Sequence, residues 1–213
     1  DDRRQRQMCI RDRIGCGVMT GAGAALNTAK VTPGSSVIVY GAGGVGIAAI
    51  QGARIAGAAE IVAVDLNDEK LNDARRFGAT HAVKPEDVDA AKLEITGGDG
   101  FDFALECIGR PLTMRASYDA IRRGGTACIV GVGRAEEMVE FSAFELFFME
   151  KTLVGSYYGG TDVRSDFHKL LRLYKQGQLD LEGMITRRIK IDEINPALEA
   201  VRNGEVIRQV IEF

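Results

Sequence analysis

Short apolar runs alternate along most of the chain with segments of helical character. The runs are apolar on both faces, which is typical of strands in a parallel sheet that helices cover on both sides. They predict strands at 36–40, 61–64, 81–83, 101–106, 126–132 and 153–158. The intervening segments predict helices at 45–56, 68–77, 85–95 and 112–123, whereas the apolar segment 144–149 is ambiguous. This alternation predicts an α/β fold with a doubly wound, parallel, six-stranded sheet.

The pattern changes after residue 158. We expect a helix at 164–175, a strand at 189–191, a helix at 196–202 and a closing strand at 206–213. Residues 1–13 follow no helical or strand period and resemble translated adapter DNA, so we expect a non-native or disordered tail there. The chain therefore divides into 1–13, 14–158 (the sheet with a lead-in helix) and a C-terminal segment, 159–213.

Composition narrows the class of protein. The net charge of −3 comes without a basic stripe, so neither nucleic acid nor a membrane is an expected partner. No apolar run approaches the roughly 20 residues of a membrane span, and no signal-peptide core is recognisable. The cysteines show no paired spacing, which favours free thiols; they are Cys9, Cys16, Cys107 and Cys128. We expect a cytoplasmic protein, since free thiols persist in a reducing compartment.

A glycine motif carries the first chemical signal. The sequence GAGGVG at 41–46 directly follows a predicted strand and opens a predicted helix, which is the context that a dinucleotide-binding loop requires. Gly41 would make the tight turn, Gly43 would let the backbone approach a pyrophosphate, and Gly46 would let the helix pack on the strand. Backbone amides at the helix start, around Gly44 and Val45, would face the diphosphate. The motif predicts a Rossmann-type dinucleotide site.

An acidic residue then selects the cofactor. Asp65 ends the second predicted strand, 19 positions after Gly46, where a carboxylate accepts hydrogen bonds from both adenosine-ribose hydroxyls. It would repel the 2′-phosphate of NADP by about 4 kcal/mol per charge pair at roughly 4 Å and an effective dielectric near 20. Leu66 and Asn67 follow, so no arginine offsets this repulsion. We therefore predict NAD as cofactor; a methyltransferase, which also has an acidic residue there, is the nearest alternative.

Five stretches resemble the zinc-containing, medium-chain alcohol dehydrogenases, near the class III glutathione-dependent formaldehyde dehydrogenase branch. They are GCGVMTGAGAALNTAKVTPGSSVIVYGAGGVG, VDLNDEK, ECIGR, IVGV and NGEVIRQVIEF, and the resemblance covers 15–213. It implies oxidation of an alcohol to an aldehyde or ketone by hydride transfer to NAD, with a catalytic zinc that polarises the alcohol. It also implies a homodimer formed through the sixth strand, and it assigns 159–213 to the catalytic domain.

The resemblance implies roles for individual residues. Cys16 matches the third ligand of the catalytic zinc. Positions that match contacts to the nicotinamide half of NAD are Thr20, Val130, Gly131, Val132 and Tyr158. Lys70 matches a lysine beside the adenosine ribose, and Arg208 matches an arginine that pairs with the pyrophosphate. Cys107 and Ile108 match positions that line the cofactor groove after the fourth strand. Each has a structural alternative: the apolar residues would be ordinary strand ends, Lys70 and Arg208 solvated charges, and Cys16 a buried small side chain.

The rest of the zinc site is not recognisable. A catalytic zinc takes three protein ligands, and neither His81 nor His168 has suitable spacing to Cys16. We therefore expect a truncated, catalytically incomplete cofactor-binding portion, with zinc and the alcohol substrate bound only by the full-length enzyme. Apolar residues of the tail would then lack packing partners, namely Leu170, Leu171, Leu173, Ile189, Ile191, Val206, Ile207, Val210 and Ile211. Alternatives are a stand-alone NAD-binding or sensing module and a zinc-free medium-chain reductase, against which Cys16 argues.

Overall fold

The computed structural model describes residues 14–212, and its centre is a six-stranded, all-parallel sheet with strand order β3-β2-β1-β4-β5-β6. The strands are β1 (Ser36–Tyr40), β2 (Glu60–Val64), β3 (His81–Val83), β4 (Phe101–Glu106), β5 (Ile121–Ile129) and β6 (Thr152–Gly155). The predicted α/β class and doubly wound sheet are confirmed. The order changes direction between β1 and β4, which makes their carboxyl ends the switch point where such folds bind ligands.

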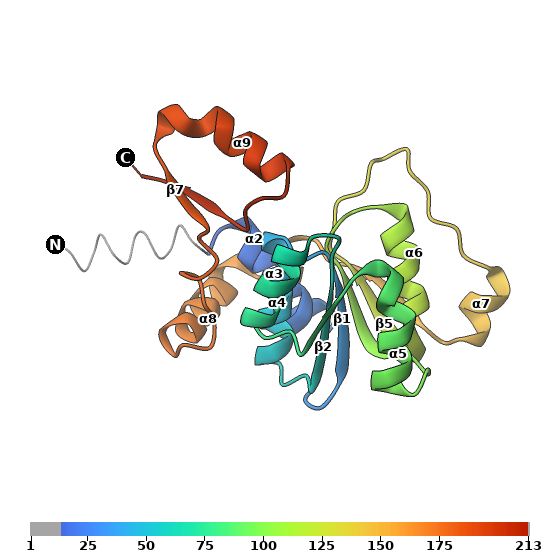
Figure 1. The fold of residues 1–213 in the computed structure, drawn as a ribbon. Coiled ribbons are helices and arrows are strands. Elements are labelled where there is room, and N and C mark those ends of the chain that lie inside the picture. The colour runs from blue at the N-terminus through green and yellow to red at the C-terminus, as the bar shows by residue number, and fades with distance from the viewer. Residues whose placement is uncertain (1–13, 213) are drawn as a thin grey trace.

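Helices cover both faces of the sheet (Figure 1). They are α2 (Cys16–Gly23), α3 (Gly44–Ile55), α4 (Asp68–Arg76), α5 (Val88–Thr96) and α6 (Pro111–Ala120). The short helix α7 (Ala143–Phe148) stands beyond α6 and buries no residue. Alternate residues of β1 enter opposite cores: Val37 and Val39 pack with α2, α3 and α4, whereas Ile38 and Tyr40 pack with α5 and α6. This two-sided burial explains why the strands show no polar alternation.

The predicted boundaries of one helix and two strands are wrong. The helix expected at 112–123 ends at Ala120, because Ile121 adopts an extended conformation (φ −83°, ψ 149°) and pairs with Phe101. The fifth strand therefore spans Ile121–Ile129 instead of 126–132. The sixth strand ends at Gly155 rather than at 158, because Tyr158 has φ +52° and begins the 3-10 turn η3 (Tyr158–Gly160).

The lead-in helix continues into a π-helical turn, η1 (Ala24–Thr28). It packs closely on α3, since a Cβ at Gly52 would lie 2.9 Å from Cα of Ala22. A Cβ at Gly21 would overlap the carbonyl oxygen of Val45. These small residues fix α2 against the first turn of α3.

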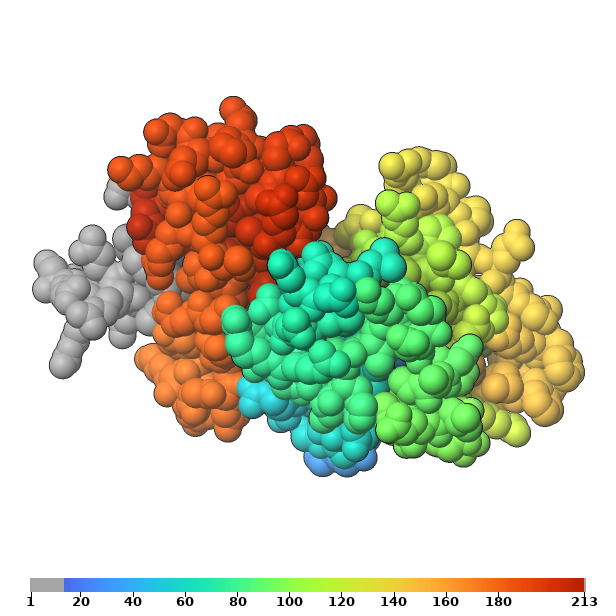
Figure 2. All heavy atoms as spheres, in the orientation of Figure 1, coloured from blue at the N-terminus to red at the C-terminus, as the bar shows by residue number. Residues whose placement is uncertain are grey.

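The C-terminal segment comprises α8 (Val163–Lys175), β7 (Arg187–Ile189), η4 (Ile191–Glu193), α9 (Ile194–Arg202) and β8 (Gln209–Ile211). Strands β7 and β8 form a separate parallel pair, shorter than the predicted 206–213 and shifted from the predicted 189–191. Figure 2 shows this segment, in orange to red, and the part around α6 and α7, in green to yellow, rising on either side of a notch.

The C-terminal segment docks on α3 through a buried glutamine. The side chain of Gln51, which is 0% exposed, accepts a hydrogen bond from Asp180 N–H (2.7 Å) and donates one to Asp180 C=O (3.2 Å). The expectation that the apolar residues of the tail lack partners is wrong for Leu170 and Ile189, each 3% exposed. It is also wrong for Leu171, Leu173 and Ile207, which pack against the hydrophobic core. It holds for Ile191, which is 58% exposed. No helix among residues 14–212 is long and apolar enough to cross a membrane.

Candidate functional site

The glycine loop joins the end of β1 to the start of α3. Gly41 has φ +91°, and its N–H donates to the carbonyl of Val64 at the end of β2 (2.8 Å). A Cβ at Gly46 would overlap the carbonyl oxygen of Gly41, so this helix packs against the loop without room for a side chain. A Cβ at Gly43, in contrast, would meet no atom within 4 Å. The open space beside Gly43 is where a pyrophosphate would approach the helix N-terminus.

Asp65 is held against this loop. One carboxylate oxygen, Oδ2, accepts the N–H of Ala42 (2.8 Å), and the other, Oδ1, accepts the N–H of Asn67 (3.0 Å). Both donors are backbone amides, so the carboxylate has a fixed direction and further lone pairs remain for a ligand. Leu66, which follows, is 77% exposed.

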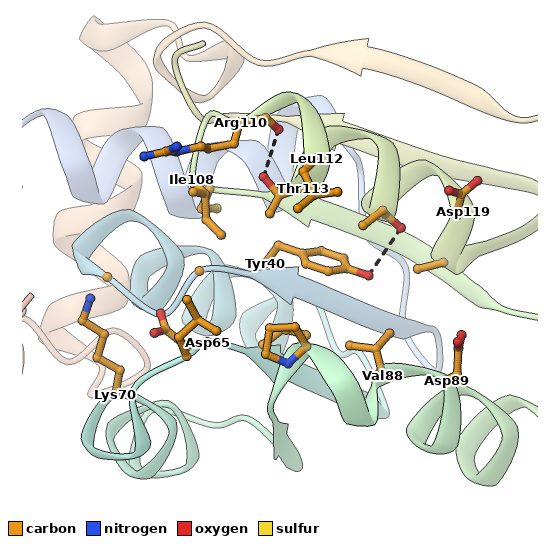
Figure 3. A pocket seen from close by; sticks show the side chains of 18 of the residues that line it. Tyr40, Asp65, Lys70, Val88, Asp89, Ile108, Arg110, Leu112, Thr113 and Asp119 are labelled. Atoms are coloured by element: carbon orange, nitrogen blue, oxygen red, sulfur yellow. Dashed lines mark hydrogen bonds between the residues drawn. The ribbon is translucent and has the colours of Figure 1, made fainter. Parts of the chain in front are cut away.

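A pocket of about 1000 Å³ opens beside the loop and Asp65. This is at the upper end of the range for small-molecule sites. Seven of the predicted cofactor residues line it: Gly41, Gly43, Asp65, Leu66, Lys70, Cys107 and Ile108. Figure 3 shows Asp65 and Lys70 on one side and Ile108 and Arg110 on the other. The structure therefore brings these seven predicted cofactor residues together around one cavity.

Residues that the sequence did not single out also line the pocket. They include Tyr40, Pro85, Arg110, Leu112, Thr113 and Arg202. The Tyr40 hydroxyl donates to the carbonyl of Ala116 (3.3 Å), and burial raises its pKa, so it remains a neutral donor. The position of Tyr40 directly before Gly41 is the sequence signal that could have placed it in the pocket. That signal is weak, because a tyrosine at the end of a buried strand is also common in hydrophobic cores.

The C-terminal segment approaches the same loop. A Cβ at Gly44, in the first turn of α3, would lie 3.1 Å from the carbonyl oxygen of Ile207. A Cβ at Gly204 would lie 2.9 Å from Nζ of Lys70. Arg208 follows Ile207, and its carbonyl accepts the N–H of Thr186 (2.9 Å). This segment therefore lies across the start of α3, where the resemblance predicts a pyrophosphate contact.

The predicted nicotinamide residues lie outside the pocket that the adenosine residues line. Val132 is 92% exposed, and Val130 is buried. Gly131 packs so closely on the loop after β4 that its Cβ would lie 2.6 Å from Cα of Gly109. Tyr158 is half-buried against the core that includes α2 and α3. None of these four positions lines the pocket beside Asp65.

Cys16 is exposed at the first position of α2, which excludes its alternative as a buried small side chain. Its Sγ lies 3.8 Å from the Thr20 hydroxyl, one helical turn away. A Cβ at the neighbouring Gly17 would lie 3.8 Å from Cγ2 of Val45, so Cys16 sits beside the glycine loop. No group of three potential metal ligands occurs among residues 14–212. The described residues alone therefore do not fit a zinc ion.

The thiols of Cys107 and Cys128 are buried, and the two histidines contact neighbouring side chains. Burial raises the pKa of Cys107, and it raises the pKa of Cys128 to about 12, so both are neutral thiols. His81 Nδ1 lies 2.9 Å from the Thr80 hydroxyl and 3.5 Å from the Glu60 carboxylate. His168 packs edge-on against Phe167. Cys9 lies outside the described residues, as does the segment 1–13 that we expect to be foreign.

The fold and the loop define a Rossmann-type dinucleotide-binding domain. A profile of the zinc-binding dehydrogenases matches residues 44–176, and the chain belongs to this zinc-binding, medium-chain alcohol dehydrogenase family. This result removes the methyltransferase alternative.

Relatives of known activity extend the match over nearly the whole chain. It is 40% identical over 216 residues to the alcohol dehydrogenase class-2 isozyme 2 of Oryctolagus cuniculus, covering 99% of this chain and 55% of that protein. It is also 40% identical over 204 residues to S-(hydroxymethyl)glutathione dehydrogenase of Escherichia coli O139:H28 (strain E24377A / ETEC), covering 94% and 55%. The chain is 40% identical to both a class-2 alcohol dehydrogenase and an S-(hydroxymethyl)glutathione dehydrogenase. Sequence identity therefore does not favour the class III-like branch over class 2.

A solved structure shows the same architecture. Benzyl alcohol dehydrogenase from Acinetobacter calcoaceticus superposes with a TM-score of 0.89 at 36% identity, covering 94% of this chain and 55% of that one. This chain therefore spans about 55% of the length of the curated relatives it matches.

Proposed function

We propose that this chain binds NAD as the cofactor-binding part of a zinc-dependent alcohol dehydrogenase, and that NADP is disfavoured. The observation that carries the proposal is the Asp65 carboxylate, which two backbone amides hold at the edge of the 1000 Å³ pocket beside the glycine loop. A carboxylate placed there accepts ribose hydroxyls and repels a 2′-phosphate.

The proposed cofactor pose uses the surfaces around this carboxylate. The pyrophosphate takes the open space beside Gly43 at the N-terminus of α3, and the backbone amides of that first turn donate to it. Adenine lies between the exposed apolar side chains of Leu66 and Ile108, which are 77% and 46% exposed. Burying these two side chains under the base gains free energy in proportion to the apolar area covered.

Cations in the pocket temper the preference for NAD. Lys70, Lys92, Arg110 and Arg202 line the same pocket as Asp65, and a 2′-phosphate would attract those within its reach. Lys92 and Arg202 are already paired, with Asp89 (3.0 Å) and Glu199 (2.7 Å). Asp65 borders the ribose position itself, so its repulsion acts at the shortest range and decides the preference.

In the complete enzyme, we propose that an alcohol is oxidised to an aldehyde or ketone while its hydride passes to NAD. The bound zinc would supply Lewis-acid polarisation of the alcohol oxygen. Cys16 is the ligand that this chain would contribute, beside Thr20 and next to the start of α3. Residues 14–212 hold no group of three potential metal ligands, so we propose that segments outside them complete the zinc site.

Strand β6 offers an edge on which the second copy expected from the resemblance would dock. Within residues 14–212, β6 pairs only with β5, and Leu153 on it is 42% exposed. The neighbouring α7 exposes Phe144 and Phe147 to 67% and 79%. An open apolar edge strand favours pairing with another strand, so we propose a homodimer through β6, which light scattering would measure as twice the chain mass.

Titration calorimetry with NAD and NADP tests the cofactor choice. The unaltered chain is expected to bind NAD at least tenfold more tightly than NADP. Asp65→Asn is expected to weaken NAD binding about tenfold, because one charged acceptor is lost. It is also expected to bring the affinities for NAD and NADP closer together. Asp68→Asn is the matched control, since it removes an equal charge on α4 outside the pocket lining and is expected to leave both affinities unchanged. Equal binding of both cofactors by the unaltered chain would refute the proposal.

A further inference from the structure

Glu106 is the only charged residue among those fully buried in the described part of the chain. It is the last residue of β4, at the switch point of the sheet, and it is 0% exposed. No ion pair to its carboxylate occurs within residues 14–212. Burying a carboxylate is unfavourable unless hydrogen bonds replace its hydration, so the role of Glu106 depends on its hydrogen-bond partners.

The partners of the carboxylate all belong to the segment that follows it. Oε1 accepts the N–H of Ile108 (3.0 Å), the N–H of Gly109 (2.9 Å) and the hydroxyl of Thr113 (2.7 Å). Oε2 accepts the Gly109 N–H as a second, weaker branch (3.1 Å). Three donors therefore converge on one side chain and fold the loop 107–109 back over the end of β4.

The main chain of Glu106 holds a second loop. Its carbonyl oxygen accepts the N–H of Val130 (2.8 Å) and of Gly131 (2.9 Å). The two loops touch, because a Cβ at Gly109 would lie 2.7 Å from the backbone nitrogen of Val132. A Cβ at Gly131 would lie 2.7 Å from Oε2 of Glu106 itself. One residue thus joins the loop after β4 to the loop after β5.

The loop after β4 reaches the cofactor pocket through Ile108. Its side chain lies over the glycine loop, since a Cβ at Gly41 would lie 2.7 Å from Cγ1 of Ile108. Ile108 also lines the pocket, together with Thr113. The loop after β5 carries Val130, Gly131 and Val132, which the family resemblance matches to contacts with the nicotinamide half of NAD. Glu106 therefore stands between the surfaces for the two halves of the dinucleotide.

We infer that Glu106 is a positioning residue that holds these two loops at a fixed separation, so that both halves of NAD bind without reordering the protein. This inference rests on the proposed NAD site. A ligand that touches both loops gains from their fixed geometry, because preorganisation removes an ordering cost from the binding free energy. AMP, which touches only the adenosine side, gains less.

Two substitutions test this role. Glu106→Gln keeps the shape but turns an N–H₂ group toward backbone N–H donors, and Thr113→Val removes one of the three donors without changing the shape. We expect Glu106→Gln to raise the Kd for NAD about tenfold and Thr113→Val about threefold. The Kd for AMP is expected to rise less than about threefold in both variants. Calorimetric titration of each variant with NAD and with AMP measures how far the Kd of each ligand rises over that of the unaltered chain.

Ser117→Ala provides the control for general destabilisation. Ser117 is fully buried on α6, and its hydroxyl donates to the carbonyl of Met114 (2.7 Å), away from both loops. It is expected to lower the melting temperature without changing the ratio of NAD to AMP affinity. Equal losses for NAD and AMP in the Glu106 and Thr113 variants would overturn the inference, and if Glu106→Gln does not fold, Thr113→Val decides it alone. Failure of the unaltered chain to bind NAD would instead refute the proposed function.

Discussion

The site formed by the glycine loop and Asp65 lies beside Cys16, because α2 packs on the start of α3. The two regions differ in how many groups of their proposed sites the described residues supply. Around the loop, backbone amides, a fixed carboxylate and a pocket of about 1000 Å³ are all present within the described residues. Around Cys16 there is one exposed thiol with a hydroxyl 3.8 Å away.

The difference follows from how each kind of site is built. The dinucleotide groups come from the carboxyl ends of β1, β2 and β4, which are neighbours in one parallel sheet, so forming the sheet assembles them. A catalytic zinc needs three side chains whose convergence depends on other segments of chain. A backbone-built site therefore accompanies its fold, whereas a metal site requires further tertiary structure.

Two glycines of the loop provide the sharpest test of this comparison. Gly46→Ala would force a Cβ onto the carbonyl oxygen of Gly41, so we expect loss of the folded state or a fall in melting temperature of many degrees. Gly43→Ala places its Cβ in open space and is expected to melt like the unaltered chain while losing NAD binding at least tenfold. Thermal melts and NAD titrations of both variants measure this. Similar melting temperatures for the pair would contradict the packing argument.

The stability of the sheet beneath the glycine loop is expected to depend on pH through the ionisation of Asp102. This carboxylate in β4 accepts the N–H (2.8 Å) and hydroxyl (2.9 Å) of Ser36 in β1 and the Nε–H of Arg122 in β5 (2.7 Å). Burial alone would raise its pKa, but these hydrogen bonds outweigh burial and lower it.

Because the folded-state pKa is lowered, the stabilisation by Asp102 is present above its unfolded pKa near 4 and is lost as the pH falls through the folded value. Melting temperatures between pH 7 and pH 3 should therefore fall more steeply for the unaltered chain than for Asp102→Asn. Parallel curves would show that Asp102 carries no such linkage. Asp99→Asn, at an exposed position before the same strand, is the control.

The smallest effect is expected at Cys16. Cys16→Ser removes the exposed thiol but no contact of the pocket, so NAD affinity and melting temperature should stay within error of the unaltered chain. Peptide mapping after brief treatment with a thiol reagent should find Cys16 labelled and Cys128 unlabelled, because burial keeps the latter in its neutral form. A large loss of NAD affinity in Cys16→Ser would contradict this comparison, because it would show that Cys16 and the glycine loop belong to one NAD site.

The sequence by itself determined the features that depend on local order along the chain. The six strands, the loop from Gly41 to Gly46 and Asp65 at the next strand end follow from short-range periodicity and from a fixed spacing within one strand–helix–strand unit.

Only the tertiary structure decided the features that depend on distant partners. The start of β5 is set by the pairing of Ile121 with Phe101. The end of β6 is set by the turn in which Tyr158 has a positive φ. Gln51 and Glu106 gave no signal in a one-dimensional pattern, because their partners, Asp180 and the loops after β4 and β5, meet them only in the packed fold. A buried polar group is defined by what surrounds it, and that surrounding exists only once the chain has folded.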